Sequence, residues 1–333
     1  MPDARPFSAV VRSPEWLADA GAWATAALSG LGDARHEPVG PARLRRVRPW
    51  SAQVVLPTRG GDVWLKACAD YARFEPGLQV VLARLAPDHV QEPLGVDAAR
   101  GWLLTADHGP SVGEGDGEQG HLVREDWVEV VRLIAQLHVA CADAREELLA
   151  TGVPDRSPAT VPARLDALVA LLSARPDEEP GHLSASRAEE LLGLRPAVAQ
   201  ACEVAESIGL PLTWVHGDLH RWNVYAEAGS LRVFDLGDSQ WSNPLTELEM
   251  PRHIVGDDPL VRITLLDEVL APWGRTWRDV TPEVATAVAV LHQVNRAEVW
   301  LGATAQADED ERRQWGASPE EELAALVPLL LRA

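Results

Sequence analysis

Short apolar runs dominate the first third of the chain, whereas apolar positions at helical spacing dominate the remainder. Strands are predicted at 44–47, 53–56, 63–67, 92–96 and 101–105. A helix is predicted before these strands. Ser13 is a suitable N-cap, Pro14 is well tolerated in a first helical turn, and Gly30 is a suitable C-terminal residue. Another helical pattern opens at Glu75. Residues 1–105 are therefore expected to form an N-terminal helix and a small, mostly antiparallel lobe.

The second part of the chain, residues 106–333, is expected to be a larger helical lobe. Helices are predicted at 127–137, 161–172, 186–208, 259–270, 282–301 and 319–331. Ser186 and Glu189 have the spacing of a capping box at the start of one of them. The fold class that these elements predict is α+β.

Composition agrees with a folded two-lobed protein. The 333 residues are 46% hydrophobic, which is enough for two lobes with their own cores. No apolar run approaches about 18 residues and none follows a basic start, so neither a membrane span nor a signal peptide is predicted and the protein is expected to be cytoplasmic. Cys68, Cys141 and Cys202 are scattered, which predicts reduced core thiols.

The formal net charge of −20 argues against a nucleic-acid partner, because binding to phosphate backbones depends on clustered lysine and arginine. A small-molecule partner is expected instead. An acidic surface concentrates cations and would suit an amine-bearing acceptor, although the same charge also serves solubility. No oligomeric state is predicted.

The strongest candidate chemistry lies between residues 216 and 238. A turn around Gly229 joins two short predicted strands, and the symmetry of this hairpin places Asn223 opposite Asp235. Their side-chain oxygens could share a Mg²⁺ ion. Asp218 lies just before the first strand, where it could accept a proton from a hydroxyl group as a catalytic base.

The spacing His-Gly-Asp-x-x-x-x-Asn at 216–223 resembles the protein-kinase catalytic loop, with Gly in place of Arg. This Gly form is similar to the aminoglycoside phosphotransferase family. Asp235-Leu236-Gly237 likewise resembles the kinase Asp-Phe-Gly metal motif. The resemblance implies a protein-kinase-like two-lobed fold, ATP or GTP as phosphoryl donor, and Mg²⁺ held by Asn223 and Asp235. A polar turn between buried strands is the competing interpretation of the same residues.

Lys66 is the only lysine among 30 basic residues. The run Val-Trp-Leu-Lys-Ala at 63–67 resembles the kinase strand whose lysine reaches the α- and β-phosphates, and the alternative is a solvated lysine on an edge strand. Glu75 is the candidate partner of Lys66. As an acidic residue in a first helical turn, it could equally act as a simple cap.

The kinase pattern fails before this strand, because residues 48–53 contain no glycine-rich loop. Pro49 lacks a backbone donor, so a phosphate cradle there would use nearby amides and the Ser51 hydroxyl. A hairpin that covers the nucleotide without touching phosphate is the other interpretation. By resemblance, the backbone from Thr105 to Asp107 would bind the adenine edge.

Taken with the resemblance, these residues predict a small-molecule kinase that moves a γ-phosphoryl group to a hydroxyl of an aminoglycoside, an amino sugar or another amine-bearing acceptor. The alternative is a catalytically inactive nucleotide-binding module of the same fold. Packing is favoured for Trp222 and Trp241 over a place in the acceptor pocket. The roles of His220 and Asp238 stay open, each between a ligand contact and a hydrogen bond that shapes the turn.

Overall fold

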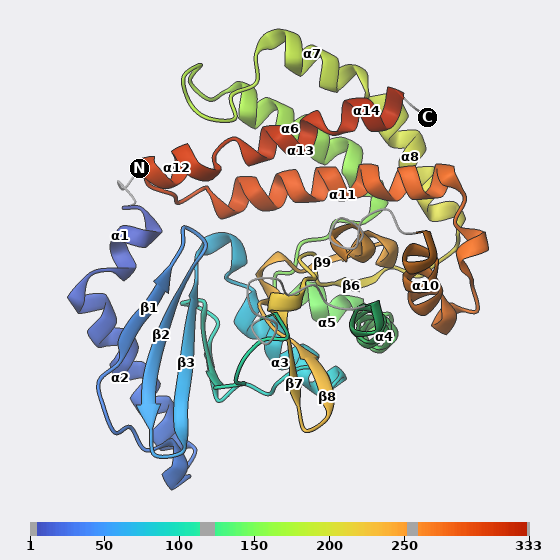
Figure 1. The fold of residues 1–333 in the computed structure, drawn as a ribbon. Coiled ribbons are helices and arrows are strands. Elements are labelled where there is room, and N and C mark those ends of the chain that lie inside the picture. Colours follow the sequence, from blue (N-terminus) through green and yellow to red (C-terminus); the bar gives the residue numbers. More distant parts are fainter. Residues whose placement is uncertain (1–4, 114–123, 252–258, 332–333) are drawn as a thin grey trace.

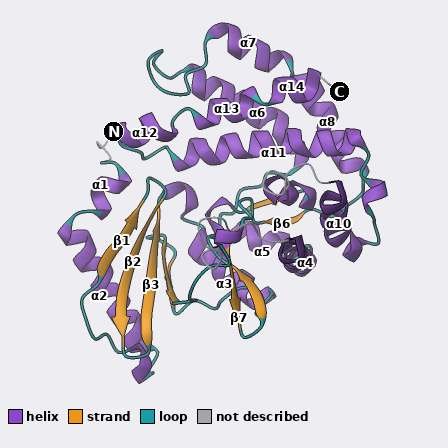
Figure 2. Ribbon diagram, viewed as in Figure 1, coloured by secondary structure: helices purple, strands orange, loops and turns teal. Residues whose placement is uncertain are grey.

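The computed structural model describes residues 5–113, 124–251 and 259–331. In it a sheet-containing lobe and a larger helical lobe lie side by side (Figure 1). Strands of the first lobe gather at one end of the molecule and helices make up most of the other (Figure 2). The α+β class and the division into a small antiparallel-sheet lobe and a larger helical lobe are therefore confirmed.

The small lobe is built on a five-stranded antiparallel sheet of order β1-β2-β3-β5-β4. The strands are β1 Arg43–Val47, β2 Ser51–Thr58, β3 Gly61–Cys68, β4 Gly95–Asp97 and β5 Trp102–Ala106. The helices are α1 Phe7–Val11, α2 Pro14–Gly30 and α3 Glu75–Leu85. The predicted cap is present, since the Ser13 side chain accepts from the amide of Trp16. Among the strands and α-helices described in this lobe, only α1 has no counterpart among the predicted elements.

One face of this sheet is apolar, and the other, called the polar face below, mixes polar and apolar side chains. Helix α2 buries Ala20, Ala24 and Leu28 against inward residues of β2 and β3 such as Val54 and Leu65. Because side chains alternate along a strand, the residues between those positions face away from α2. This second face carries Lys66 and faces the helical lobe.

The large lobe contains ten described helices. They are α4 Arg124–Cys141, α5 Arg145–Ala150, α6 Val161–Ser173, α7 Ala185–Gly193, α8 Arg195–Ser207, α10 Pro259–Leu270, α11 Pro282–Ala303, α12 Glu309–Trp315, α13 Ser318–Ala324 and α14 Leu326–Leu331. Two short antiparallel pairs join β6 Thr213–Val215 to β9 Gln240–Ser242, and β7 Val224–Glu227 to β8 Ser230–Val233. The long helix α11 runs across this lobe (Figure 1).

Two predicted helices were wrong in their extent. The span 186–208 is two helices that meet at Leu194, and Pro196 lies in the first turn of the second, where proline is well tolerated. The cap is Ser184, whose hydroxyl accepts from Arg187, so the Ser186 capping box is wrong. The span 319–331 is likewise divided between α13 and α14.

The main hydrophobic core crosses from one lobe to the other. Leu78 and Leu82 of α3 pack in the same buried cluster as Trp127 of α4 and Trp214 of β6. Within the described residues, no helix is both long enough and apolar enough to cross a membrane. The shared core fixes the start of α3 relative to β6, and both are adjacent to the site described next.

Candidate active site

Lys66 lies on β3 and forms two ion pairs, one within the small lobe and one with the helical lobe. Its Nζ is 2.6 Å from Oε2 of Glu75 and 2.5 Å from Oδ1 of Asp235. The side chain of Lys66 is 14% exposed and that of Glu75 is 1% exposed. The pairing of Lys66 with Glu75 is therefore present, and the solvated-lysine alternative is wrong.

The carboxylate of Glu75 has several donors. It accepts from the amide of Leu236 at 2.9 Å and from the thiol of Cys68 at 3.2 Å, in addition to Lys66. Glu75 is also the first residue of α3, so its negative charge lies at the positive end of that helix. The two interpretations of Glu75 are thus compatible, because one carboxylate both pairs with Lys66 and stabilises the start of α3.

These contacts keep the buried groups charged. Burial alone would lower the pKa of Lys66, but the Asp235 and Glu75 carboxylates raise it above its usual value. Burial alone would raise the pKa of Asp235, but the Lys66 ammonium lowers it. A lysine in this setting remains a cation.

The loop that carries Asp218 is held by a glutamate 29 positions further on, Glu247. This glutamate lies in η7 Pro244–Leu248 and is 1% exposed. It accepts from the amide of His216 at 2.6 Å and from the amide of Gly217 at 3.3 Å. Sequence reasoning missed Glu247, because no local motif shows which distant carboxylate meets these two amides.

Gly217 is required by both its conformation and its surroundings. Its φ is +81°, and a Cβ at this position would lie 2.4 Å from the carbonyl oxygen of Asp238. An L-residue disfavours this backbone region, and no side-chain rearrangement would relieve contact with a backbone oxygen. The glycine that distinguishes the motif from the protein-kinase form is therefore needed for the close approach of two loops.

The Asp218 carboxylate lies between the imidazole of His220 and the guanidinium of Arg296. Its Oδ2 is 3.3 Å from Nε2 of His220, and its Oδ1 is 3.8 Å from the guanidinium of Arg296. Burial would raise the pKa of Asp218, but the His220 hydrogen bond and the Arg296 charge together lower it to about 2. Burial would lower the pKa of His220, but Asp218 raises it above the usual value. Asp218 is thus ionised at neutral pH.

His220 provides a test of this electrostatic account. We expect His220→Gln to move the acidic limb of the kcat/KM profile to higher pH, because loss of the His220 contact raises the pKa of Asp218 and a protonated carboxyl cannot accept a proton. The profile is measured for wild type and variant over the pH range in which circular dichroism shows both folded. An acidic limb that stays in place, or moves to lower pH, would contradict the proposed coupling.

The β7–β8 hairpin has a register one residue away from the predicted one. Val224 pairs with Val233, and the amide of Phe234 donates to the carbonyl of Asn223. The turn consists of Ala228 and Gly229, both with positive φ, as expected of a two-residue hairpin. Asn223 therefore lies opposite Phe234, and the prediction that it lies opposite Asp235 is wrong.

Asp235 is brought back to the site by its backbone. It has φ 61° and ψ 64°, a left-handed conformation that few residues other than glycine adopt. Strained conformations of this kind cluster at functional sites. Here the turn lets the Asp235 carboxylate reach Lys66 instead of continuing along β8.

Asn223 and Asp235 have the donor atoms that Mg²⁺ prefers. The Nδ2 of Asn223 donates to the carbonyl and to Oδ2 of Asp218 at 2.9 and 3.3 Å, which leaves its carbonyl oxygen for a cation. Mg²⁺ is typically bound by one or two protein oxygens together with phosphate and water. The oxygen donors of Asn223 and Asp235 therefore fit a nucleotide-associated Mg²⁺. Among the described residues no cluster of three or more His, Cys, Asp or Glu side chains has the arrangement of a metal cage.

Asp238 belongs to a network that sequence reasoning did not anticipate. Its carboxylate accepts from the Tyr71 hydroxyl at 3.1 Å and pairs with Arg296 of α11 at 2.9 Å. Burial raises the pKa of Asp238, and the Arg296 charge opposes that change. No local pattern marks Arg296, since its partners are about 60 and 80 positions earlier. Asp238 thus joins the metal motif to both lobes.

The turn between β1 and β2 is short and tied to the helical lobe. The amide of Arg48 donates to the Ser51 carbonyl at 2.8 Å. The Trp50 ring meets Trp300 of α11 and Trp315 of α12 edge-on, with centroids 6.0 and 5.3 Å apart. Ser51 is buried at the start of β2, opposite Cys68. Its expected contact with phosphate stays a prediction.

The segment that links the lobes is anchored from both sides. The amide of Asp107 donates to the Asp62 carbonyl at 3.2 Å, and the expected contact of the backbone from Thr105 to Asp107 with adenine stays a prediction. Thr105 lies beyond Leu104, where the pairing with β4 ends. The His108 ring stacks on Tyr225 of β7 with centroids 4.4 Å apart, a contact that no sequence motif indicates.

The two tryptophans near the motifs behave differently. Trp241 is 3% exposed and pairs with Trp214 in the β6–β9 ladder, so its predicted packing role is confirmed. Trp222 is 46% exposed and lies against Gly113, where an added Cβ would come within 2.7 Å of its ring. The prediction that Trp222 packs beneath the loop is wrong.

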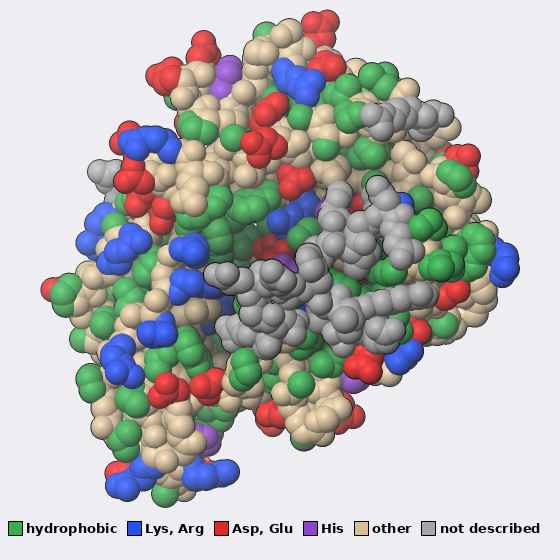
Figure 3. Space-filling model, in the orientation of Figure 1, with side chains coloured by type: hydrophobic (Ala, Val, Ile, Leu, Met, Phe, Trp, Pro, Cys, Tyr) green, Lys and Arg blue, Asp and Glu red, His purple; other side chains and the backbone are tan. Residues whose placement is uncertain are grey.

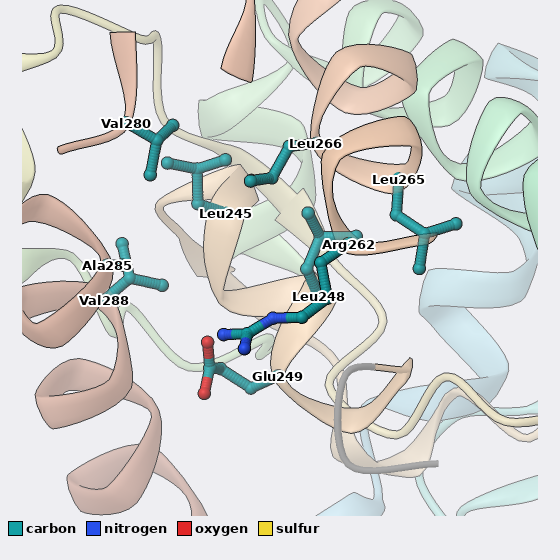
Figure 4. A pocket seen from close by; sticks show the side chains of 9 residues that line it. All are labelled: Leu245, Leu248, Glu249, Arg262, Leu265, Leu266, Val280, Ala285 and Val288. Atoms are coloured by element: carbon teal, nitrogen blue, oxygen red, sulfur yellow. The ribbon is translucent and has the colours of Figure 1, made fainter. Parts of the chain in front are cut away.

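The surface between the lobes is hollowed. Acidic and basic side chains lie there next to hydrophobic ones (Figure 3). A separate cavity of about 60 Å³ lies among η7, α10 and α11. Aliphatic side chains surround it, including Leu248, Leu265 and Val288, and the Arg262 guanidinium points toward the Glu249 carboxylate (Figure 4). None of its lining residues belongs to the catalytic loop or the metal motif.

Comparison with known proteins adds a family match. The model of the phosphotransferase enzyme family matches residues 66–280, a span that includes Lys66, Asp218 and Asp235. A search of curated proteins gave no match.

Solved structures show the same two-lobed, protein-kinase-like fold. A macrolide 2'-phosphotransferase from Brachybacterium faecium superposes with a TM-score of 0.56 at 19% identity, over 87% of this chain and 96% of that one. A choline kinase from Streptococcus pneumoniae gives 0.59 at 13%, over 89% and 95%. A spectinomycin phosphotransferase, solved with ADP and spectinomycin, gives 0.51 at 12%, over 89% and 93%. At these identities the likeness concerns the fold alone.

Proposed function

The chain belongs to the phosphotransferase enzyme family and is a small-molecule kinase, and on that premise we propose that it transfers the γ-phosphoryl group of ATP or GTP to a hydroxyl of a small molecule. The observation that carries the proposal is the convergence of Lys66, Glu75 and Asp235 in one partly buried ion-pair cluster, which also interacts electrostatically with Asp218. The Asp218 carboxylate raises the pKa of Asp235 through its charge, so the two carboxylates share one electrostatic environment.

Each group has a defined task in the proposed reaction. Lys66 orients the α- and β-phosphates, and Glu75 holds its ammonium in place. Asn223 and Asp235 hold Mg²⁺, which neutralises charge on the β- and γ-phosphates when bound. Asp218 orients the acceptor hydroxyl and takes its proton. Because the pKa of Asp218 is about 2, the carboxylate is a weak base that accepts the proton late, which suits a loose transition state.

We propose that the acceptor carries an amine, as in an aminoglycoside or amino sugar. The net charge of −20 supports a cationic ligand. Near the base, Asp218, Asp238 and Glu322 all interact electrostatically with Arg296, so three carboxylates face one fixed cation. The similar proteins named above act on macrolides, choline and spectinomycin. The acceptor pocket is proposed to lie between the catalytic loop and the helices after the metal motif.

The proposal includes a cytoplasmic location. All three cysteines are unpaired and buried, as expected of a protein in a reducing compartment.

The experiment that tests this function is a screen for acceptor-dependent ADP or GDP release over a library of antibiotics, amino sugars and amino alcohols, with Mg²⁺ and each nucleotide. An acceptor that stimulates release in wild type but not in Asp218→Asn supports the proposal. Nucleotide binding by calorimetry with no stimulated release across the library would favour the alternative, an inactive nucleotide-binding module.

The single lysine permits a chemical test of the nucleotide site. We expect Lys66 to react with an amine-directed reagent more slowly than the α-amino group, because burial and a raised pKa suppress the reactive neutral amine. Saturating Mg-ATP should slow its labelling further, whereas adenosine, which lacks phosphates, should not. Peptide mass spectrometry follows the rates. Equal labelling with and without Mg-ATP would place Lys66 outside the phosphate site.

A further inference from the structure

Strand β1 carries a concentration of positive charge in an otherwise acidic protein. Arg43, Arg45, Arg46 and Arg48 fall within six residues of a chain whose net charge is −20. In the described part of the structure, none of the four forms an ion pair, and the Arg48 guanidinium donates only to the carbonyl of Val47. Basic side chains gather along the small-lobe side of the hollow between the lobes (Figure 3). Four guanidinium groups without carboxylate partners suggest that an anion is bound nearby.

The strand register selects one of these arginines. Arg46 pairs with Gln53 of β2, and Gln53 pairs with Lys66 of β3. Residues directly opposite in antiparallel strands have side chains on the same face. Arg46, Gln53 and Lys66 therefore form a row across the polar face of the sheet, with the proposed phosphate-binding lysine at its end.

An irregularity in β1 creates this row. The register shifts between Leu44 and Arg46, so Arg45 is the extra residue of a β-bulge. With strict alternation, Arg46 would point to the same face as Leu44, which packs against the α2 core. The shift sends Val47 to the core in its place and turns Arg46 to the polar face. Bulges commonly redirect a side chain next to an active site.

Arg46 lies on the sheet face that carries the ion pair of Lys66 with the metal motif. The Arg46 side chain is exposed, and the Nζ of Lys66 in the same row is 2.5 Å from Oδ1 of Asp235. The guanidinium is therefore available on the face where we propose that the nucleotide phosphates bind.

The β1–β2 turn does not offer the usual means of phosphate binding. It contains no glycine, Pro49 has no amide hydrogen, and the Arg48 amide already donates to Ser51. The contacts of Trp50 with Trp300 and Trp315 further fix the turn against the helical lobe. A side-chain donor on β1 can supply what these amides do not.

We propose that Arg46 binds the β- or γ-phosphate of the nucleotide and replaces the backbone amides of a glycine-rich loop. This inference rests on the proposed nucleotide site but does not depend on the identity of the acceptor. Arginine suits the task, because its planar guanidinium forms two parallel hydrogen bonds with phosphate and stays charged at any physiological pH. The ligand recognised is a nucleoside di- or triphosphate in preference to a nucleoside.

The test compares Arg46→Gln with Arg45→Gln by calorimetry, using Mg-ATP, Mg-ADP and adenosine on the full chain. Both residues are exposed arginines of β1, but only Arg46 has a ladder partner in the row that contains Gln53 and Lys66. We expect Arg46→Gln to raise the Kd for Mg-ATP roughly tenfold, as for loss of one charged hydrogen bond, and to leave that for adenosine unchanged. Arg45→Gln should change the Kd of every ligand less than about twofold.

Three results would overturn the inference. The first is an equal change in the Kd for Mg-ATP in the two variants. The second is an equal loss of affinity for adenosine and for Mg-ATP in Arg46→Gln. The third is that wild type does not bind Mg-ATP. Arg46-dependent binding without phosphoryl transfer would leave the inference standing while removing the proposed function. If phosphoryl transfer occurs and Arg46→Gln changes neither the KM nor the Kd of the nucleotide, the inference is wrong and the proposed function stands.

Discussion

Replacing Asp218 with asparagine is expected to lower turnover by about 10²–10⁴-fold, the usual contribution of a general base. The amide keeps the size of the side chain but cannot accept the acceptor's proton. Nucleotide affinity should change little, because the proposed phosphate contacts come from Lys66 and from Asn223 and Asp235 through the metal. The measurements are steady-state turnover with a saturating acceptor and the Kd of Mg-ATP.

Asp177→Asn provides a matched control, since the Asp177 side chain is 95% exposed and the substitution is chemically the same. It should be indistinguishable from wild type. Turnover of Asp218→Asn within about threefold of wild type would remove Asp218 from the role of base.

The second large effect is expected at Asp235. Asp235→Ala should abolish Mg²⁺-dependent nucleotide binding, because it removes the proposed metal ligand and leaves the buried Lys66 ammonium with one carboxylate in place of two. Asn223→Ala should act in the same direction but more weakly, since a neutral amide oxygen attracts the cation less than a carboxylate.

Calorimetry with Mg²⁺ and with a chelator separates the two consequences of Asp235→Ala. The loss should appear only with Mg²⁺, and binding of metal-free ATP should persist or improve because Lys66 is freed for the phosphates. An unchanged Mg-ATP affinity would show that Asp235 is not a ligand of the nucleotide's metal.

The parts of the site that sequence could predict are those encoded over short distances. Asp218 and Asn223 lie five residues apart on one loop, and Asp235 follows across a hairpin, so a motif and a turn suffice to group them. Lys66 was recognisable because it is the only lysine and has strand-like flanks. Its pairing with Glu75 follows from a strand and a helix that are adjacent in the chain.

The parts that sequence could not predict depend on contacts between distant segments. Glu247 holds the amides of the catalytic loop, and Arg296 reaches Asp218 and Asp238 from α11. Neither is marked by a local pattern, because a helix or loop brings each to the site only after the helical lobe has packed. The anchoring of the Asp107 amide by Asp62 was hidden for the same reason.

Smaller errors arose where one residue changes the outcome. The β7–β8 register depends on whether the turn is centred on Gly229 or between Ala228 and Gly229, and only the positive φ of both residues decides it. The β1 bulge similarly exchanges the faces of Arg46 and Val47. Strict alternation along β1 would place Arg46 and Val47 on the opposite faces, since one inserted residue reverses every later position.

Direct detection of the product is the sharpest test of whether this chain moves a phosphoryl group from a nucleotide to a hydroxyl. ATP labelled in its γ-phosphate is incubated with Mg²⁺ and an acceptor from the release screen, and mass spectrometry identifies the labelled product. We expect a labelled phosphate ester on the acceptor with wild type and a strongly reduced amount with Asp218→Asn. Label found only in inorganic phosphate, or equal ester formation by both proteins, would contradict it.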